Sequence, residues 1–317
     1  MHPAFSVIFL TTLIGAGQGL FLALFLAECW VFVAVISPPP RGFFALGSAL
    51  VLGLLALGLV ASFFHLGHPE RAWRSAAMWR TSWLSREVIV LPVTMAIVAA
   101  YGLVHYVGDA GVASKTTLII GSVGVFAALT LFVCTGMIYA CIKFLQEWAS
   151  PLTVINYTLL GSASGFTLAV AYAAYRAPEL VSLYTGWAIA LTLIALAMRS
   201  ASLVRNAGLR PKSTLQTAIG VRHNQIAQKA QGSMGGSFNT REFFPHASAQ
   251  WIRGVKWIFL VLVFPAPIIL LLVGSKTFAS QVLVSAFIVQ YLGLIAERWF
   301  FFAQANHPQN LYYQTIS

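Results

Sequence analysis

The chain has 317 residues, of which only 9% are charged and 59% are hydrophobic. An ordinary soluble domain carries roughly 25% charged residues, so this chain has too few charges to cover a water-exposed surface. Disordered chains are excluded as well, because they are rich in charge and poor in apolar residues. Composition therefore places the chain among the integral membrane proteins.

Eight apolar segments are long enough to cross a hydrocarbon core about 30 Å thick, which takes roughly 20 residues of helix. They cover residues 5–36, 43–64, 87–107, 115–141, 152–175, 181–203, 254–273 and 278–303. The sequence thus predicts an all-α, polytopic membrane protein in which residues 1–317 form a single membrane domain. Because the number of spans is even, both termini are expected on the same side.

Positive charge indicates which side that is. On the predicted topology, fifteen of the nineteen Lys and Arg residues fall on the side of the termini, and the other side holds only four: Arg41, Lys115, Arg176 and Lys276. Cytoplasmic loops of membrane proteins are enriched in Lys and Arg, so we expect both termini to be cytoplasmic. This asymmetry explains the net charge of +11 without any binding of nucleic acid.

Two loops on the cytoplasmic side are long, residues 65–86 and residues 204–253. Loops beyond about 12–15 residues are often functional or disordered. Each is interpreted either as a flexible connector or as part of a surface on which a cytoplasmic partner docks.

The first of these loops and its borders hold the richest group of polar side chains. His65 and His68 occur there with three tryptophans and four arginines, and Glu87 follows at the start of the third span. Histidine can donate or accept a hydrogen bond and titrates near neutral pH, which suits a quinone headgroup that exchanges protons. We therefore expect His65 and Glu87 to be catalytic.

Simpler interpretations of the same residues stay open. Trp73, Trp79 and Trp83 would also fit an aromatic belt at the membrane surface, and the arginines would fit topology signals. Glu87 would also be stabilised by the dipole at a helix N-terminus, with Ser85 as the N-cap.

Neither metal nor haem is expected in this chain. Pro69 interrupts the helical spacing that a His65–His68 metal site would use, and no third ligand is near in sequence. The three cysteines form no CxxC motif, so the chain lacks the usual ligands of zinc or an iron–sulfur cluster. A bis-histidine haem needs two histidines at the same depth, whereas His105 lies at the opposite end of the third span.

The first span contains further polar residues and a packing motif. Gly15 and Gly19 form a GxxxG pattern, which favours close approach of another helix. Gln18 lies between them and is a candidate for binding the quinone headgroup. Glu28 lies deeper, where an intramembrane carboxylate is either a proton relay or a neutral, hydrogen-bonded group. Glu297 and Arg298, near the end of the eighth span, are expected to form a pair at the membrane interface.

Two stretches of sequence resemble the DmsC-type membrane anchor family. These are the run from His65 through Arg74 (HLGHPERAWR) and the run from Trp79 through Glu87 (WRTSWLSRE), and the span-one segment GAGQG resembles that family too. The family comprises the anchor subunits of dimethyl sulfoxide reductase and related molybdoenzyme complexes, including quinone-linked sulfite dehydrogenases. The resemblance is strongest over residues 5–110 and weakest over the 204–253 loop.

The resemblance implies a three-subunit complex in a bacterial inner (cytoplasmic) membrane. One partner subunit would carry molybdopterin, a second would carry iron–sulfur clusters, and the anchor would exchange electrons with ubiquinone or menaquinone as substrate. The family's quinol-site histidine corresponds to His65. Our hypothesis adds Gln18, Arg71, Trp83 and Arg86 as quinone-binding residues, with Arg71 or Arg86 stabilising negative charge on the ring.

Three functions are compared at this point. The first is a quinone-reducing sulfite dehydrogenase anchor, preferred slightly for its overall likeness to such anchors, with a quinol-oxidising dimethyl sulfoxide reductase anchor as the alternative. The second is a small-solute transporter, which the one-sided polar cluster and the lack of an internal repeat do not favour. The third is a purely structural anchor with no quinone site.

Overall fold

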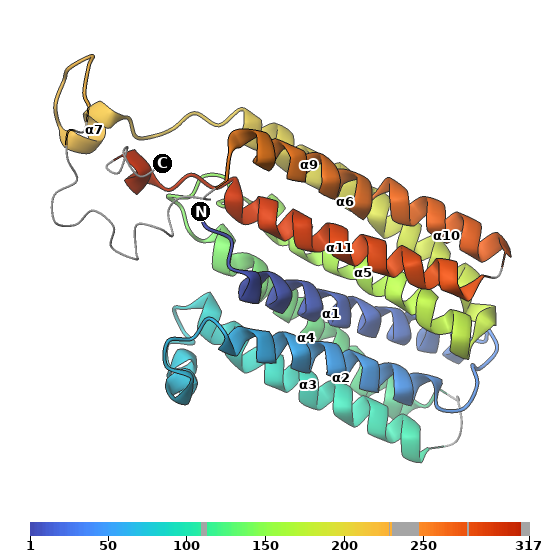
Figure 1. Ribbon diagram of the computed structural model, residues 1–317. Coiled ribbons are helices and arrows are strands. Elements are labelled where there is room, and N and C mark those ends of the chain that lie inside the picture. Colours follow the sequence, from blue (N-terminus) through green and yellow to red (C-terminus); the bar gives the residue numbers. More distant parts are fainter. Residues whose placement is uncertain (109–112, 228, 230–246, 278, 312–317) are drawn as a thin grey trace.

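The computed structural model describes residues 1–108, 113–227, 229, 247–277 and 279–311. All regular secondary structure in these residues is helical, and eight helical spans are long and apolar enough to cross a membrane. The predicted all-α class and the eight spans are therefore confirmed. Figure 1 shows the long helices side by side in one bundle.

The bounds of the helices agree with the prediction at most ends. The first six spans are α1 (Phe5–Phe32), α2 (Phe43–Phe63), α3 (Trp83–Val107), α4 (Lys115–Ala140), α5 (Pro151–Arg176) and α6 (Val181–Ala207). The seventh span is divided into α9 (Ala249–Val263) and α10 (Pro265–Thr277), and α11 (Ser280–Ala303) is the eighth. The short elements are η1 (Pro69–Ala76), η2 (Pro178–Leu180), α7 (Leu215–Ile219) and η4 (Pro308–Leu311).

The N-terminus and η4, the last described element, lie at one end of the bundle, which we name the termini end, with the far end opposite (Figure 1). The amino group of Met1 donates to the carbonyl oxygen of Ala305 over 2.8 Å. The loop that contains His65 is at the termini end, and η1 forms its middle. Of the predicted 204–253 loop, residues 204–207 continue α6, whereas residues 228 and 230–246 lie outside the described residues.

Serine caps begin four of the long helices. The side chains of Ser82, Ser114, Ser150 and Ser248 accept backbone N–H groups in the first turns of α3, α4, α5 and α9. A serine oxygen at this position satisfies one of the unpaired donors of a helix start. The expected cap at Ser85 is wrong, because Ser82 is the cap and Ser85 supplies the N–H, with N and Oγ 3.3 Å apart. The helix therefore starts at Trp83, one turn before the predicted residue 87.

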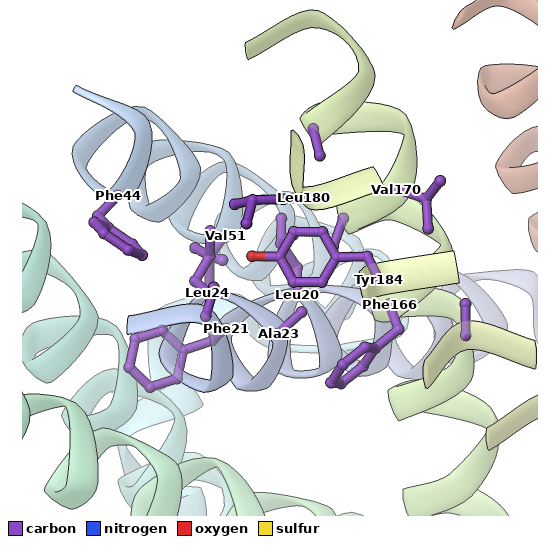
Figure 2. Packing of buried hydrophobic residues seen from close by; sticks show 14 of the residues in the cluster. Leu20, Phe21, Ala23, Leu24, Phe44, Val51, Phe166, Val170, Leu180 and Tyr184 are labelled. Carbon is purple, nitrogen blue, oxygen red and sulfur yellow. The ribbon is translucent and has the colours of Figure 1, made fainter. Parts of the chain in front are cut away.

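Helix α1 is the centre of the bundle. It packs against α2, α4, α5 and α11, and Figure 1 shows it between the group of α2, α3 and α4 and the group of α5, α6, α9 and α11. Figure 2 shows Leu20, Phe21 and Leu24 of α1 among apolar side chains of α2, α5 and α6. The first span thus has neighbours on most sides, as its small residues allow.

The GxxxG motif of α1 is a close-approach site, as predicted. A Cβ atom at Gly19 would lie 2.9 Å from the Cα of Ser162 and closer still to the carbonyl oxygen of Gly161 in α5. A Cβ at Gly165 would overlap the backbone of Gly19. The backbones of α1 and α5 can approach this closely only because glycine is present on both helices.

The seventh span is broken by proline. Phe264, between α9 and α10, has φ −111° and ψ −78°, and Pro265 and Pro267 follow it. A proline ring removes a backbone donor and crowds the preceding turn. The amide of Gln290 in α11 donates to the carbonyl oxygen of Val263 over 3.2 Å. A neighbouring helix thereby supplies a hydrogen bond that the bent helix lacks.

Enlarging a glycine at the α1–α5 contact should destabilise the bundle. We expect Gly165→Ala to lower the free energy of unfolding by about 1–3 kcal/mol or more, because overpacking forces backbones apart. Gly53→Ala in α2 is the matched control, since nothing lies within 4 Å of a Cβ there. Unfolding of both variants in detergent is the measurement. Equal stability of the two variants would contradict the proposed contact.

Candidate functional site

A small polar cavity lies inside the bundle between α1, α3, α4, α5 and α11. Its volume is about 20 Å³, which is room for about one water molecule where polar partners are present. The polar residues in its wall are Thr11, Thr12, Gln18, Glu87, Thr135, Tyr157, Ser164 and Arg298. We name this space the polar cavity.

Glu87 is the acid in the wall of the polar cavity. It belongs to the buried stripe of α3, which also contains Leu91, Thr94 and Val98 at helical spacing. Its side chain is 7% exposed, and its Oε1 accepts a hydrogen bond from the hydroxyl of Thr135 in α4. Because Glu87 is the fifth residue of α3, it lies near the termini end, on the same side of the bundle as the His65 loop.

Gln18 lines the same cavity from α1. Its side chain is 2% exposed, and Nε2 donates to the carbonyl oxygen of Ala128 in α4 over 3.0 Å. The structure therefore brings together two of the sequence-predicted site residues, Gln18 and Glu87, although they belong to different helices. Their sequence positions alone did not place them at one cavity.

His65 lies apart from that cavity, in the linker directly after α2. Its side chain is exposed, and the pKa of the imidazole is lowered by partial burial. Since the ordinary pKa is already below 7, His65 is neutral at neutral pH and has one donor and one acceptor nitrogen. A neutral imidazole of this kind can donate a hydrogen bond to an oxygen atom.

The loop after His65 is held by charges and aromatic rings. Glu70 contacts His68 at 3.0 Å and Arg71 at 3.7 Å, and all three side chains are largely exposed.

In the described residues, no group of three or more His, Cys, Asp or Glu side chains is arranged to hold a metal ion.

Arg86 joins the end of this loop to the start of α3. Its guanidinium lies 4.2 Å from the centre of the Trp83 ring and donates to the carbonyl oxygens of Trp79 at 3.0 Å and Arg80 at 2.8 Å. The predicted pair of Trp83 and Arg86 is therefore close together. Two nitrogens of the Arg86 guanidinium thus donate to the backbone, whereas Arg71 keeps an exposed guanidinium.

An apolar groove opens on the outer side of α1 and α2 at the termini end. Its wall is formed by Ser6, Phe9, Leu13, Leu57, Val60, Ala61 and Phe64, and it encloses about 370 Å³. Phe64 is directly followed by His65. This α1–α2 groove and the polar cavity flank α1 at the same level, because Leu13 faces the groove and Thr12 faces the cavity.

A buried ionic cluster next to the polar cavity was missed from the sequence. Arg199 Nε lies 2.8 Å from Glu297 Oε1, and Arg298 Nε lies 3.1 Å from Glu297 Oε2. All three residues are at most 4% exposed. The expected pair of Glu297 and Arg298 exists, but it is buried in the bundle rather than at the interface. Arg199 is its partner and not a surface charge of the cytoplasmic side.

Helical spacing could have found this cluster. Gln290, Gly293, Leu294 and Glu297 recur at intervals of three and four residues and form the buried stripe of α11. A charge within such a stripe must be paired inside the protein. The partner on α6 could not be identified in this way, because no pattern in the sequence relates one helix to another.

A second buried cluster lies toward the far end. The hydroxyl of Tyr101 donates to Glu28 Oε2 over 2.7 Å, and His105 Nε2 lies 3.3 Å from Glu28 Oε1. Glu28 and Tyr101 are fully buried and His105 is 8% exposed. Glu28 looks isolated in the sequence, but two side chains of α3 contact it in the structure.

Comparison with known proteins identifies the family. The model of the family "DMSO reductase anchor subunit (DmsC)" matches residues 1–304. The chain is also 56% identical, over 325 aligned positions that cover all of both chains, to a sulfite dehydrogenase subunit of Allochromatium vinosum. The resemblance seen in the sequence is thereby confirmed, and the chain belongs to the DMSO reductase anchor subunit family.

Proposed function

We propose that this chain is the membrane anchor of a sulfite dehydrogenase complex and the subunit at which that complex reacts with quinone. Its partners are an iron–sulfur electron-transfer subunit and a molybdopterin-containing catalytic subunit. Family membership supports the anchor role, and the name of the Allochromatium relative supports sulfite rather than dimethyl sulfoxide as the substrate of the complex. The complex resides in the bacterial inner membrane, with both termini of this chain in the cytoplasm.

One observation carries the quinone assignment. At the termini end, an apolar groove is lined by Phe64, the residue before His65, and the buried Glu87 and Gln18 line an internal polar cavity on another side of α1. A quinone needs an apolar path for its tail, a donor for its carbonyl oxygen and a route for protons. The α1–α2 groove, His65 and Glu87 have these three properties.

The proposed reaction joins one quinone, two electrons and two protons to give a quinol. The ring enters from the bilayer along the α1–α2 groove. His65 donates a hydrogen bond to one oxygen and passes that proton to it, while the other ring nitrogen of His65 takes up a proton from water. Glu87 relays protons from the cytoplasm through the polar cavity, where Gln18 supplies a further polar contact. Electrons come from the nearest cluster of the docked partner.

Two further groups act on the ring in this proposal. Arg71 stabilises negative charge that develops on the oxygen, because its guanidinium is exposed and only loosely paired with Glu70. Trp83 flanks the ring, and Arg86 holds Trp83 and the loop in place through its three contacts. Arg86 thus acts by positioning its neighbours.

The docking surface is proposed to consist of the 65–86 and 204–253 loops. In the first loop Trp73 is 71% exposed, Met78 63% and Trp79 53%. The guanidinium of Arg74 lies 5.5 Å from the Trp73 ring and that of Arg80 lies 5.3 Å from the Trp79 ring. Tryptophan and arginine are the residue types that most often dominate protein interfaces.

Replacement of His65 tests the quinone site. We expect His65→Ala to lower quinone-linked sulfite oxidation by the complex about 10²–10⁴-fold, the usual contribution of an acid–base group. Turnover with an artificial electron acceptor should not change, because that acceptor bypasses the membrane site. His68→Ala is the matched control and should keep both activities. Unchanged quinone turnover in His65→Ala would refute the assignment.

Replacement of Glu87 tests the proton route. Glu87→Gln keeps the volume and a hydrogen bond to Thr135 but cannot carry a proton. We expect quinone-linked turnover to fall at least about 10-fold, while Thr135→Val, which keeps the carboxylate, loses less. Glu179→Gln at the far end serves as the control for loss of one acid. Steady-state rates of the assembled complex are the measurement, and equal rates for all variants would exclude the relay.

Charge reversal tests the docking surface. We expect Arg74→Glu combined with Arg80→Glu to weaken co-purification of the iron–sulfur subunit, with the loss greater at low salt than at high salt. Arg41→Glu combined with Lys276→Glu, on the far end, is the matched control. If both double variants retain the partner equally across the salt range, the 65–86 loop is not the docking surface.

A further inference from the structure

The cluster of Glu28, Tyr101 and His105 is not used by the proposed quinone chemistry. It joins α1 and α3, which both contact α2 and α4 and which meet each other at the rings of Phe21 and Tyr101, with centres 5.3 Å apart. The cluster thus crosses the middle of a four-helix group. Both helices also reach the polar cavity, through Gln18 and Glu87, but at the termini end.

The contacts of Glu28 leave one position for a shared proton, between its Oε1 and Nε2 of His105. Tyr101 occupies Oε2 of Glu28, so Oε1 faces Nε2 of His105 at 3.3 Å. Within the described residues neither of these two atoms has another hydrogen-bond partner. An unprotonated carboxylate and an unprotonated nitrogen would repel each other, so one proton must lie between them. A low-dielectric interior favours the form in which Nδ1 of His105 also carries a hydrogen, because the pair is then neutral overall.

The surroundings offer no fixed charge in place of this proton. Phe44 of α2 lies over the His105 ring, with centres 4.7 Å apart. Gly121 of α4 faces the Tyr101 ring without a polar group. In the described chain, the other titratable groups that act electrostatically on the cluster are the thiol of Cys29 in α1 and the phenol of Tyr184 in α6. All of these groups are neutral in their ordinary forms.

His105 is also the residue of the cluster closest to the surface. It keeps 8% of its surface exposed, and Tyr106 and Val107, which end α3, are 74% and 76% exposed. His105 is the third residue from the end of α3, so it lies toward the far end, opposite the His65 loop. A proton can reach Glu28 through the two ring nitrogens of His105, since imidazole accepts on one nitrogen and releases from the other.

We propose that Glu28 and His105 form a proton-binding site that exchanges with the compartment opposite the termini. The pair holds one shared proton and takes up a second when the pH on that side falls, so its net charge changes from zero to +1. Tyr101 orients the carboxylate. This site is independent of the quinone site, and its titration belongs to the pair rather than to either residue alone.

The test measures protonation directly in the full-length chain in lipid vesicles. The ¹⁵N NMR signals of the seven histidines report imidazole protonation, and the infrared carbonyl band reports a protonated carboxyl group. We expect one of these signals to titrate within the pH range over which the chain stays folded, and to be lost from that range in both Glu28→Gln and His105→Gln. No titrating signal assigned to either residue in this range would overturn the proposal in favour of a structural contact.

Setting the pH separately on each side of the vesicles tests the direction of exchange. The cluster should follow the compartment opposite the termini, while His68, identified with His68→Gln, should follow the termini side as an internal reference. A cluster that follows the same compartment as His68 would overturn the route. Tyr101→Phe keeps both titrating groups, and we expect it to retain the titration with a midpoint shifted by a measurable fraction of a pH unit. If Glu28→Gln does not fold, the shift of the midpoint in Tyr101→Phe still tests the proposal.

Discussion

The contact between α1 and α5 at Gly19 and Gly165 determines where every polar group of the first span can lie. Because glycine has no side chain at this contact on either helix, α1 can lie in the centre of the bundle, where it has neighbours on most sides. Its Gln18 then meets the backbone of α4, its threonines line the polar cavity, and its Glu28 meets α3. A first span at the edge of the bundle would have left these groups facing lipid, at a cost that no helix packing could offset.

Inside a bilayer, each buried charge must find its partner within the protein, and the three buried acids of the described spans do so in different ways. Glu297 is held between two arginines, Glu28 is shared by a histidine and a tyrosine, and Glu87 has only a hydroxyl and the wall of a small cavity. The carboxylate without a cationic partner is the one beside the cavity. That difference distinguishes the candidate proton carrier from the acid of the arginine cluster, which contacts two guanidinium groups.

The sequence was sufficient for the number of spans, most helix ends and the GxxxG contact, because each depends on local hydropathy or on residues of one helix. Errors arose where the decisive group lay elsewhere. The cap of α3 was assigned to Ser85 because its helix was started one turn late. Arg199 was counted as a surface charge, and Glu28 looked isolated, because their partners are on helices that the sequence does not place. His65 is a prediction from its motif alone, whereas the polar cavity is formed by five helices and could not be predicted from any one of them.

The bend in the seventh span constrains which substitutions this protein can accept during evolution. In a straight helix, the carbonyl oxygen of Val263 would accept the N–H of residue 267, but that residue is proline and has no N–H to give. Gln290 fills this gap from α11 and also contacts Thr192 of α6. Among homologous chains, the proline and the glutamine should therefore be gained and lost together. A chain that regains a donor at 267 no longer needs a polar side chain at 290, and its seventh span is free to straighten.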